Sequence, residues 1–204
     1  MSEFDQKATD WDKDQIHIQR SEAIASELLK MIPITSTMHA LEFGAGTGLL
    51  SFILKDRLSE IIMIDNSKEM IRVVQEKIDA EQSLNMKALC VDLVKDPYEN
   101  QFDLIYNQMV FHHVEDIEFI VKKFHTLLKP GGYLAIADLY TEDGSFHGKG
   151  FTGHKGFDVD QLATILVKQG FTNIQHTECF VINRVNEKLE TTSYPVFLLT
   201  ATRK

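Results

Sequence analysis

The sequence predicts an α/β fold in which a mostly parallel sheet is covered by helices on both faces. Short apolar segments typical of strands alternate along the chain with longer amphipathic segments typical of helices. The C-terminal part differs, because two long strand-like segments follow each other there, and their short connection suits an antiparallel pair at one edge. The 204 residues contain no internal repeat and no low-complexity linker, so we expect one domain, 1–204.

The N-terminal elements are predicted from polarity and spacing. Residues 1–18 are polar with isolated apolar side chains, so we expect a mobile arm or short helices that could close over a site. Apolar residues three and four positions apart predict a helix over 19–32, and Pro33 lies just past its end. Residues 39–43 form the first predicted strand, directly before a run of glycines.

The rest of the chain continues the alternation. Ser67 is placed to cap one helix, Lys129-Pro130-Gly131-Gly132 ends the clearest amphipathic helix, and Gly170 ends the last one. The predicted helices and strands are, in order, helix 49–54, strand 61–64, helix 70–78, strand 87–91, strand 102–106, helix 117–128, strand 133–137, helix 158–169, and strands 172–183 and 195–202.

Charge and composition exclude several classes of function. The formal net charge is −9, and adjacent cationic residues occur only as the two separate pairs Lys122-Lys123 and Arg203-Lys204. Without a larger basic patch, nucleic acid is a poor candidate substrate. The two cysteines are far apart and form no CxxC motif, which leaves a disulfide framework or a cysteine zinc site unsupported. The polar start is unlike a signal peptide, and no apolar run is long enough to cross a membrane, so we expect a cytoplasmic protein.

The glycine run between the first strand and the next helix predicts a ligand-binding loop. Gly44, Gly46 and Gly48 allow a tight turn and a close approach of the backbone to a ligand. The dinucleotide fingerprint G-x-G-x-x-G would need glycine at position 49, where Leu49 stands. The alternative is a turn that only packs a strand against a helix.

Polar residues end four successive predicted strands, and the carboxyl ends of parallel strands are where ligands bind in such sheets. Glu42 precedes the first glycine, Asp65 ends the second strand, Asp92 follows the third and Asn107 ends the fourth. Asp65 is placed to accept the two hydroxyls of a ribose, and Asp92 to reach an adenine amino group. The alternatives are a helix cap for Asp65 and a surface loop for Asp92.

These segments together resemble the class I S-adenosylmethionine-dependent methyltransferases, particularly their small bacterial members. The matching stretches, which cover roughly residues 38–140, are LEFGAGTG, IIMIDNSKEMI, CVDL, FDLIYNQMVFHHVED and LLKPGGYLAIADL. Phe4-Asp5 and Trp11-Asp12 are similar to the family's N-terminal arm, which folds over the cofactor. The resemblance implies a three-layer Rossmann-like fold with seven strands in the order 3-2-1-4-5-7-6 and the last strand antiparallel.

The resemblance also implies roles for individual residues in binding S-adenosylmethionine. Glu42 stands where many members carry aspartate, and its longer side chain should still reach the cofactor's amino group. The implied cofactor-binding residues run from the methionine part through the ribose to the adenine and the floor below the sulfonium: Glu42, Phe43, Gly44, Ala45, Gly46, Gly48, Asp65, Asn66, Met70, Asp92, Leu93, Asn107 and Gln108.

The chemistry of methyl transfer points to a smaller set of candidate residues. The transfer is an in-line displacement that needs mainly alignment, and a general base only where the acceptor must lose a proton. His112 and His113 follow the fourth strand and are the candidate catalytic residues. The alternative is that these side chains contact the substrate or simply pack.

Two segments are the candidates for substrate contact. The glycine-rich loop 141–156 carries His147 and His154 at the carboxyl edge of the sheet, where a substrate lid belongs, although it could be a solvated connection. Trp11, the only tryptophan, is placed to act in the arm as a lid or as a packing staple. The histidine spacings match no defined zinc pattern, so no metal is expected.

The sequence therefore predicts a methyltransferase that acts on a small molecule without nucleic-acid or membrane partners. A non-catalytic S-adenosylmethionine-binding or regulatory protein and a protein methyltransferase are the alternatives. The acceptor atom and the oligomeric state are left open by the sequence.

Overall fold

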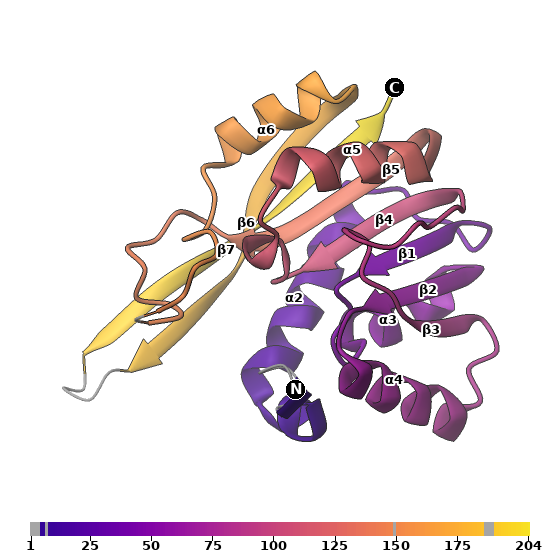
Figure 1. Ribbon diagram of the computed structural model, residues 1–204, viewed down its shortest axis with the longest axis horizontal. Helices are drawn as coiled ribbons and strands as arrows, with labels where there is room; N and C mark the ends of the chain where they lie inside the picture. The colour runs from indigo at the N-terminus through magenta and orange to yellow at the C-terminus, as the bar shows by residue number, and fades with distance from the viewer. Residues whose placement is uncertain (1–4, 7, 149, 186–189) are drawn as a thin grey trace.

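A computed structural model describes residues 5–6, 8–148, 150–185 and 190–204, and it contains one seven-stranded sheet with helices on both faces (Figure 1). The strand order is β3-β2-β1-β4-β5-β7-β6, and only β7 runs antiparallel to its neighbours β5 and β6. The predicted Rossmann-like topology is therefore confirmed. The strands are β1 His39–Phe43, β2 Glu60–Asp65, β3 Met86–Cys90, β4 Phe102–Gln108, β5 Leu128–Leu139, β6 Phe171–Val185 and β7 Thr191–Arg203.

The helices form a layer on each face of the sheet because each buries one apolar stripe. Helices α2, α3 and α4 pack on one face through Leu28, Leu50 and Val74, among other side chains. Helices α5 and α6 cover the opposite face, where Phe124 and Leu166 lie in the larger core cluster. The helical segments are η1 Ala8–Lys13, α2 Gln15–Met31, α3 Leu49–Leu54, η2 Lys55–Arg57, α4 Lys68–Glu81, η3 Phe111–His113, α5 Ile117–Leu127 and α6 Val159–Lys168, with η denoting 3-10 helix.

The register of the parallel strands brings their carboxyl ends together. Phe43 of β1 lies beside Ile64 of β2, and the next residue of β2, Asp65, lies beside Cys90 of β3. On the other side of β1, strand β4 extends to Gln108, next to Ala137 of β5. Loops leaving β1, β2, β3 and β4 consequently start from the same edge of the sheet.

Helix α2 and strand β5 begin earlier than predicted. Helix α2 begins at Gln15 rather than 19, because the side chain of Asp14 caps it by accepting from the amide of Ile16, so that part of the predicted arm is helical. Strand β5 begins directly after α5 and includes the predicted break at Lys129–Gly132, since a register shift against β4 accommodates these residues.

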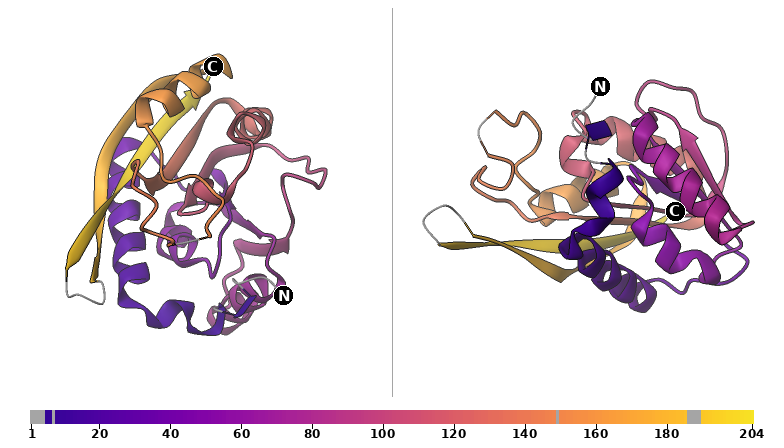
Figure 2. Two further views of the ribbon diagram at one scale, coloured as in Figure 1. Left: turned by 60° about the vertical axis from the view of Figure 1, so that its left-hand side comes forward. Right: turned by 90° about the horizontal axis from the view of Figure 1, so that it is seen from below.

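The last two strands are also longer than predicted and form a hairpin that reaches past the rest of the sheet (Figure 2). The pairing of β5 with β7 ends at Leu139 and Val196, whereas β6 and β7 pair as far as Val185 and Thr191. Phe146 from the loop after β5 packs on this extension. In the described part of the chain, no helix has the length and apolar character needed to cross a membrane.

Candidate active site

The loop after β1 is a tight glycine turn that lies against the loop after β4. Gly44, Gly46 and Gly48 all have positive φ, at +65°, +55° and +78°, a conformation that glycine adopts without strain. A Cβ on Gly44 would lie 2.3 Å from a methyl carbon of Val110. The glycines were predicted to let the backbone come close to a neighbouring group. At Gly44 that neighbouring group is the side chain of Val110.

A cavity of about 790 Å³ opens at the carboxyl edge of the sheet, beside this loop. It is bounded by the N-terminal arm, the ends of β1 to β4, the segment after β4 and the loop after β5. Most of the residues predicted to bind cofactor or substrate line it, namely Trp11, Phe43, Gly44, Ala45, Gly46, Asp65, Asn66, Met70, Asp92, Leu93, Gln108, His112, His113 and His147.

The carboxyl group of Glu42 is fully buried between β1, β4 and α3. One of its oxygens accepts a hydrogen bond from the Ser51 hydroxyl, which also contacts the Tyr106 hydroxyl at 2.6 Å. Its other oxygen, Oε1, has no hydrogen-bond partner among the described residues. Burial raises the pKa of Glu42 from 4.5 to about 8, although the bonds from Ser51 act in the opposite direction.

Asp65 ends β2 with its carboxylate held by two backbone amides. Oδ2 accepts from the Gly46 amide at 2.9 Å, and Oδ1 accepts from the Ser67 amide at 2.8 Å. The hydroxyl of Ser67, not Asp65, caps helix α4 by accepting from the Met70 amide. Burial raises the pKa of Asp65 above its ordinary value, and the two amide bonds offset part of that shift. The carboxylate therefore joins the glycine loop to the cavity wall.

The N-terminal arm is anchored by polar contacts as well as by Trp11. Asp12 accepts from the Thr47 hydroxyl at 2.5 Å and from the Lys77 ammonium at 2.9 Å. Lys77 also donates to the backbone oxygen of Thr47 at 2.8 Å. The indole of Trp11 stacks on His17, with ring centroids 4.2 Å apart. The polar groups of the arm therefore supply much of its anchor.

His112, on the cavity wall after β4, is held by a buried carboxylate. Its Nδ1 lies 2.6 Å from an oxygen of Asp138, and its backbone amide donates to the other oxygen at 3.2 Å. Asp138 is fully buried and also accepts from the Leu139 amide. The bond to Asp138 orients the imidazole and directs Nε2 away from the carboxylate.

His113 and His147 gather around His112 with the ring of Phe151 beside them. The His147 ring stacks on Phe151 at 3.9 Å between centroids and lies 4.8 Å from the His112 ring. Desolvation lowers the pKa of His147 to about 4, with further lowering by His112 and Arg184. His147 is therefore a neutral imidazole near pH 7.

These three histidines are the grouping in the described ranges that could hold a metal ion. One ring nitrogen from each lies within 4.8 Å of the others, while nitrogens bound to zinc at about 2.0–2.1 Å would be closer together. The chain spacing could not suggest this grouping, because residues 35 positions apart meet only after β5 folds beside β4. That no metal binds here stays a prediction.

The chain is similar in sequence to methyltransferases. The model of a methyltransferase domain family matches residues 41–136, from β1 to β5. An uncharacterized methyltransferase of Bacillus thuringiensis is 30% identical over 161 residues, which cover 77% of this chain and 74% of that protein. The chain belongs to the class I S-adenosylmethionine-dependent methyltransferases.

Other relatives agree with this membership. An uncharacterized methyltransferase of Schizosaccharomyces pombe is 28% identical over 158 residues. These residues make up 69% of this chain, and the match spans only 55% of the length of that relative. The fold is similar to a methyltransferase of Aquifex aeolicus, with a TM-score of 0.66 and 22% identity over 88% of this chain and 89% of the other. The fold is also similar to phosphoethanolamine N-methyltransferase 2 of Haemonchus contortus, which was solved with phosphomonomethylethanolamine and S-adenosylhomocysteine. The TM-score is 0.72 and the sequence identity 17%, over 91% of this chain and 52% of the other.

The residues present fit S-adenosylmethionine, the cofactor of this methyltransferase. Oε1 of Glu42, two residues before Gly44 in the chain, is a buried acceptor with no partner among the described residues, and the ammonium of the cofactor's methionine part is a group that would satisfy it. Asp65 and Asp92 stand at the ends of β2 and β3, on the same side of the cavity. Their carboxylates suit the hydroxyl and amino donors of adenosine.

Four residues predicted for the site of the methyltransferase do not line the cavity. Glu42 lies on the opposite face of β1 from Leu41 and Phe43, so its side chain points toward α3. Gly48 is the N-cap residue of α3 and lies near Met63. Glu42 and Gly48 therefore flank the glycine loop in the chain without lining the cavity.

Asn107 and His154 are the other two. Asn107 is buried on the face of β4 that it shares with Ile105, and neither amide atom is bonded to a described residue. The residues of this segment that line the cavity are Gln108 and Met109. His154 turns away because its Nε2 contacts the backbone oxygen of Val114 at 3.0 Å, and its amide donates to the oxygen of His112. Its contacts fasten the loop 141–156, whose residue 149 lies outside the described chain.

The sequence reasoning missed several residues of the methyltransferase site. Asp138 interrupts an otherwise apolar strand segment, a signal that could have found it. Arg20 lies on the buried stripe of α2, four residues before Ile24, and a charge on an apolar face is a comparable signal. Arg184 and Phe146 gave no signal, because only the tertiary fold brings β6 and the loop after β5 to the cavity. Residues 1–4 and 7, including Phe4 of the predicted arm, lie outside the described chain.

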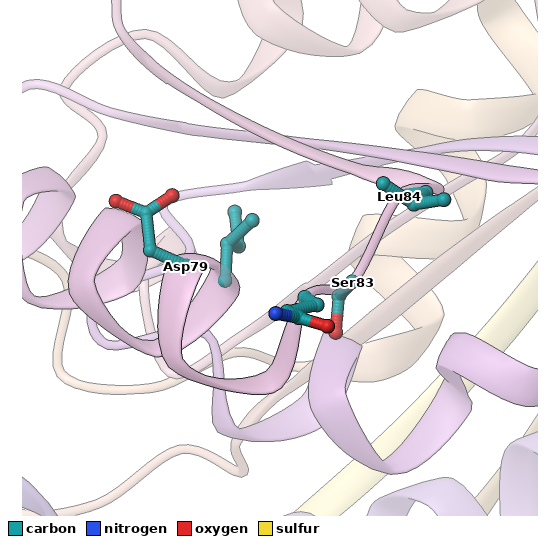
Figure 3. A pocket seen from close by; sticks show the side chains of 5 residues that line it. Asp79, Ser83 and Leu84 are labelled. Atoms are coloured by element: carbon teal, nitrogen blue, oxygen red, sulfur yellow. The ribbon is translucent and has the colours of Figure 1, made fainter.

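A second hollow, of about 430 Å³, lies at the C-terminal end of α4 (Figure 3). Asp79, Ser83 and Leu84 line it together with Ile78 and Gln82. Leu84 is almost fully exposed, and one carboxylate among otherwise unreactive side chains offers no catalytic arrangement. The larger cavity is therefore the candidate active site of the methyltransferase.

Proposed function

We propose that this methyltransferase transfers the methyl group to a small-molecule acceptor by in-line displacement. The observation that carries the proposal is the extent of the cavity, which reaches from the carboxylates of Asp65 and Asp92 to the imidazole of His112. One space thus offers cofactor-binding groups at one end and a proton acceptor at the other. The arm and the loop after β5 border the space, which favours a small acceptor over a folded protein.

The cofactor-binding roles in this proposal are those that the resemblance to the family implies, and most of the residues concerned line the cavity. Glu42 and the loop from Phe43 to Gly48 hold the methionine part, and Asp65 accepts the ribose hydroxyls. Asn66 and Met70 flank the adenosine, while Asp92 and Leu93 hold the adenine. Gln108, which accepts from the Ser21 hydroxyl at 3.0 Å, forms the floor below the sulfonium, with Asn107 behind it.

S-adenosylmethionine supplies an activated methyl group on sulfur. The protein aligns the acceptor with it, which contributes about 7–11 kcal/mol in well-oriented reactions. His112 takes the acceptor's proton on Nε2 while Asp138 stabilises the resulting imidazolium, and His113, His147 and Trp11 contact the acceptor. The neutral state of His147 keeps a second charge away from that imidazolium.

Support for a small acceptor also comes from the solved relative of the same fold. The Haemonchus contortus enzyme holds phosphomonomethylethanolamine together with S-adenosylhomocysteine. A fold of this kind therefore has room for a metabolite beside the cofactor.

Two measurements test the proposed function. Isothermal titration should show binding of S-adenosylmethionine and none of nicotinamide dinucleotides, and S-adenosylhomocysteine should form when a metabolite panel is added. Asp65→Ala should weaken cofactor binding by roughly 1–3 kcal/mol through loss of charge-assisted hydrogen bonds. Cofactor binding without any turnover would instead indicate a regulatory protein, and turnover only with protein substrates would overturn the small acceptor.

A further inference from the structure

Arg20 is a buried cation on the wall of the cavity. It lies in the second turn of α2, on the stripe that continues through Ile24 and Leu28 into the core. Only 5% of its surface is exposed, and its Nε has no hydrogen-bond partner in the described ranges. The same residue lines the candidate active site, so the unsatisfied donor borders the space that a ligand would occupy.

An unpaired guanidinium in this position is costly, because burial removes its hydration and no direct partner replaces it. Burial accordingly lowers the pKa of Arg20 to about 10, while Asp138 and Asp14 act in the opposite direction. Neither carboxylate forms an ion pair with Arg20 within the described chain. Asp138 accepts from His112 and from the Leu139 amide, and Asp14 caps α2. Arg20 thus has counter-charges at a distance but no bonded anion.

A second arginine stands at the same end of the cavity. The guanidinium of Arg184 lies 3.9 Å above the ring of Phe146 and donates to the Phe146 backbone oxygen. Arg184 is near enough to Arg20 to disfavour the charge of Arg20. Two like charges around one space favour a ligand of opposite sign.

The other end of the cavity carries the opposite charge. Asp65 and Asp92 line it there, where the cationic cofactor is proposed to bind, and Lys95 on the same wall pairs with Asp92 at 2.8 Å, which leaves Asp65 as the carboxylate without a paired cation among the described residues. The remaining carboxylates on the wall are Asp10, Asp14 and Glu115. The carboxylate of Asp14 caps α2 by accepting from the Ile16 amide, and it forms no ion pair with the Arg20 guanidinium in the described chain. Arg20 and Arg184 are therefore the cations on the wall that have no ion-pair partner in the described chain, whereas Lys95 is paired.

We propose that Arg20, with Arg184 beside it, binds an anionic group of the methyl acceptor, a carboxylate or a phosphate. This inference rests on the proposed function, since it assigns the substrate class to the same cavity. The planar guanidinium of arginine matches the oxygens of both anions, and bonding to Nε would satisfy the buried donor. The acceptor atom then lies between the arginines and the cofactor, within reach of His112.

The unmodified protein provides the first test. The methyltransferase saturated with S-adenosylhomocysteine is titrated with sodium phosphate or sodium acetate at constant ionic strength, while NMR follows the Nε–H resonance of Arg20. We expect a saturable shift with at least one anion, and the ratio of the two affinities tells phosphate from carboxylate. A resonance that does not move, or that moves linearly without saturation, overturns the proposal.

Matched variants provide the second test. Arg20→Met keeps the apolar stem and removes the charge, and we expect it to weaken phosphate or acetate binding at least tenfold. Arg72→Met is the control, because Arg72 is exposed on α4 and pairs with Glu69 and Glu76 away from the cavity. We expect the control to bind anions like the parent. Equal anion binding by a folded Arg20→Met protein overturns the proposal, and if that variant does not fold, the NMR titration decides.

Turnover separates this inference from the proposed function. With carboxylate, phosphate, neutral and cationic acceptors of similar size, we expect S-adenosylhomocysteine from the anionic ones, and a KM raised at least tenfold in Arg20→Met. Turnover of neutral or cationic acceptors alone would overturn the anionic class while leaving methyl transfer intact. Saturable anion binding in a protein that fails to bind S-adenosylmethionine would instead remove the proposed function and keep the anion site.

Discussion

Glu42 shows how far a single side chain depends on its surroundings in this fold. A glutamate in water is ionised at pH 7, yet this one is enclosed by β1, β4 and α3, and its pKa is raised to about 8. The neutral form therefore predominates near pH 7 until a cation arrives. The ammonium of the cofactor's methionine part is such a cation in the proposed function.

Cofactor binding should consequently release a proton from Glu42. We expect calorimetry of S-adenosylmethionine binding at pH 7 to give an apparent enthalpy that varies with the ionisation enthalpy of the buffer. In Glu42→Gln the part due to this residue should disappear, because glutamine cannot titrate. Identical proton release in the parent and the variant would show that Glu42 keeps its charge state when the cofactor binds.

His112 and Asp138 should behave as one unit in catalysis. We expect His112→Gln to lower kcat by roughly 10²–10⁴-fold with little change in cofactor affinity, as loss of a general base does. Asp138→Asn should lower kcat as well, because the carboxylate orients the imidazole. His176→Gln, on the exposed edge strand β6, is the control. A kcat that survives His112→Gln would exclude proton transfer to this histidine.

Removal of metal should leave the activity unchanged. His112, His113 and His147 are spaced more widely than bound ligands need to be, and His112 serves as the base in the proposed function. We expect dialysis against EDTA to keep kcat within the error of the assay. Loss of activity that zinc restores would assign these histidines to a metal site and remove the base.

At the scale of elements, the arm and the loop after β5 border one cavity but are held by different means. The arm is tied to the glycine loop and α4 through Asp12, Thr47 and Lys77. The loop 141–156 is fastened to the backbone of the site, since the amide of His154 donates to the backbone oxygen of His112 at 2.8 Å. The arm is thus the element whose attachment depends on a few side-chain contacts.

Breaking the arm's anchor should weaken cofactor binding. Lys77→Met removes the ion pair to Asp12 and the bond to Thr47, and these groups are partly exposed, so we expect a loss of about 0.5–1 kcal/mol. The change should appear mainly as faster release of S-adenosylmethionine in stopped-flow measurements of Trp11 fluorescence. Lys68→Met, on the exposed face at the start of the same helix, is the control. Unchanged release would mean that the arm does not retain the cofactor.

The elements also show what could be predicted from local sequence. Strands and helices followed from apolar spacing, and the antiparallel pair followed from two long segments with a short connection. The early start of α2 escaped because one capping bond from Asp14 outweighs the polar composition of its first turn. The continuation of β5 through Pro130 and Gly131 escaped because pairing with β4 decides it, which no local pattern reports.

At the scale of the whole molecule, stability and cofactor binding make opposite demands on the buried carboxyl of Glu42. The unfolded chain would lose its proton near pH 4.5 and the folded chain near pH 8. Between these values the folded state binds more protons than the unfolded state, so the free energy of unfolding falls as the pH rises. This contribution is fully present below about pH 4.5 and is lost by about pH 8.

Chemical denaturation should reveal this dependence. Between pH 5 and 8 we expect the free energy of unfolding of the parent to fall relative to that of Glu42→Gln, by roughly 3–5 kcal/mol over the full window. Other groups titrate equally in both proteins, and the difference between the two curves isolates Glu42. Parallel curves would mean that the folded protein keeps this carboxyl ionised.

The site itself was predictable only in part, for a reason that applies to the whole molecule. Asp65 and the glycines belong to a local strand–loop–helix pattern, and they line the cavity as that pattern suggests. Arg20, Asp138 and Arg184 come from α2, β5 and β6, and they meet only because the sheet is completed by its late strands. Sequence patterns report local conformation, whereas this half of the site is assembled from distant segments.

The charge polarity of the cavity bears on how the spent cofactor leaves. In the proposed reaction the sulfur is positive before transfer and neutral afterwards, so S-adenosylhomocysteine loses an attraction to Glu42 and Asp65 that S-adenosylmethionine retains. The methylated acceptor remains near Arg20 and Arg184. We therefore expect the carboxylate end to favour fresh cofactor over spent cofactor, which would limit product inhibition and keep successive turnovers moving in one direction.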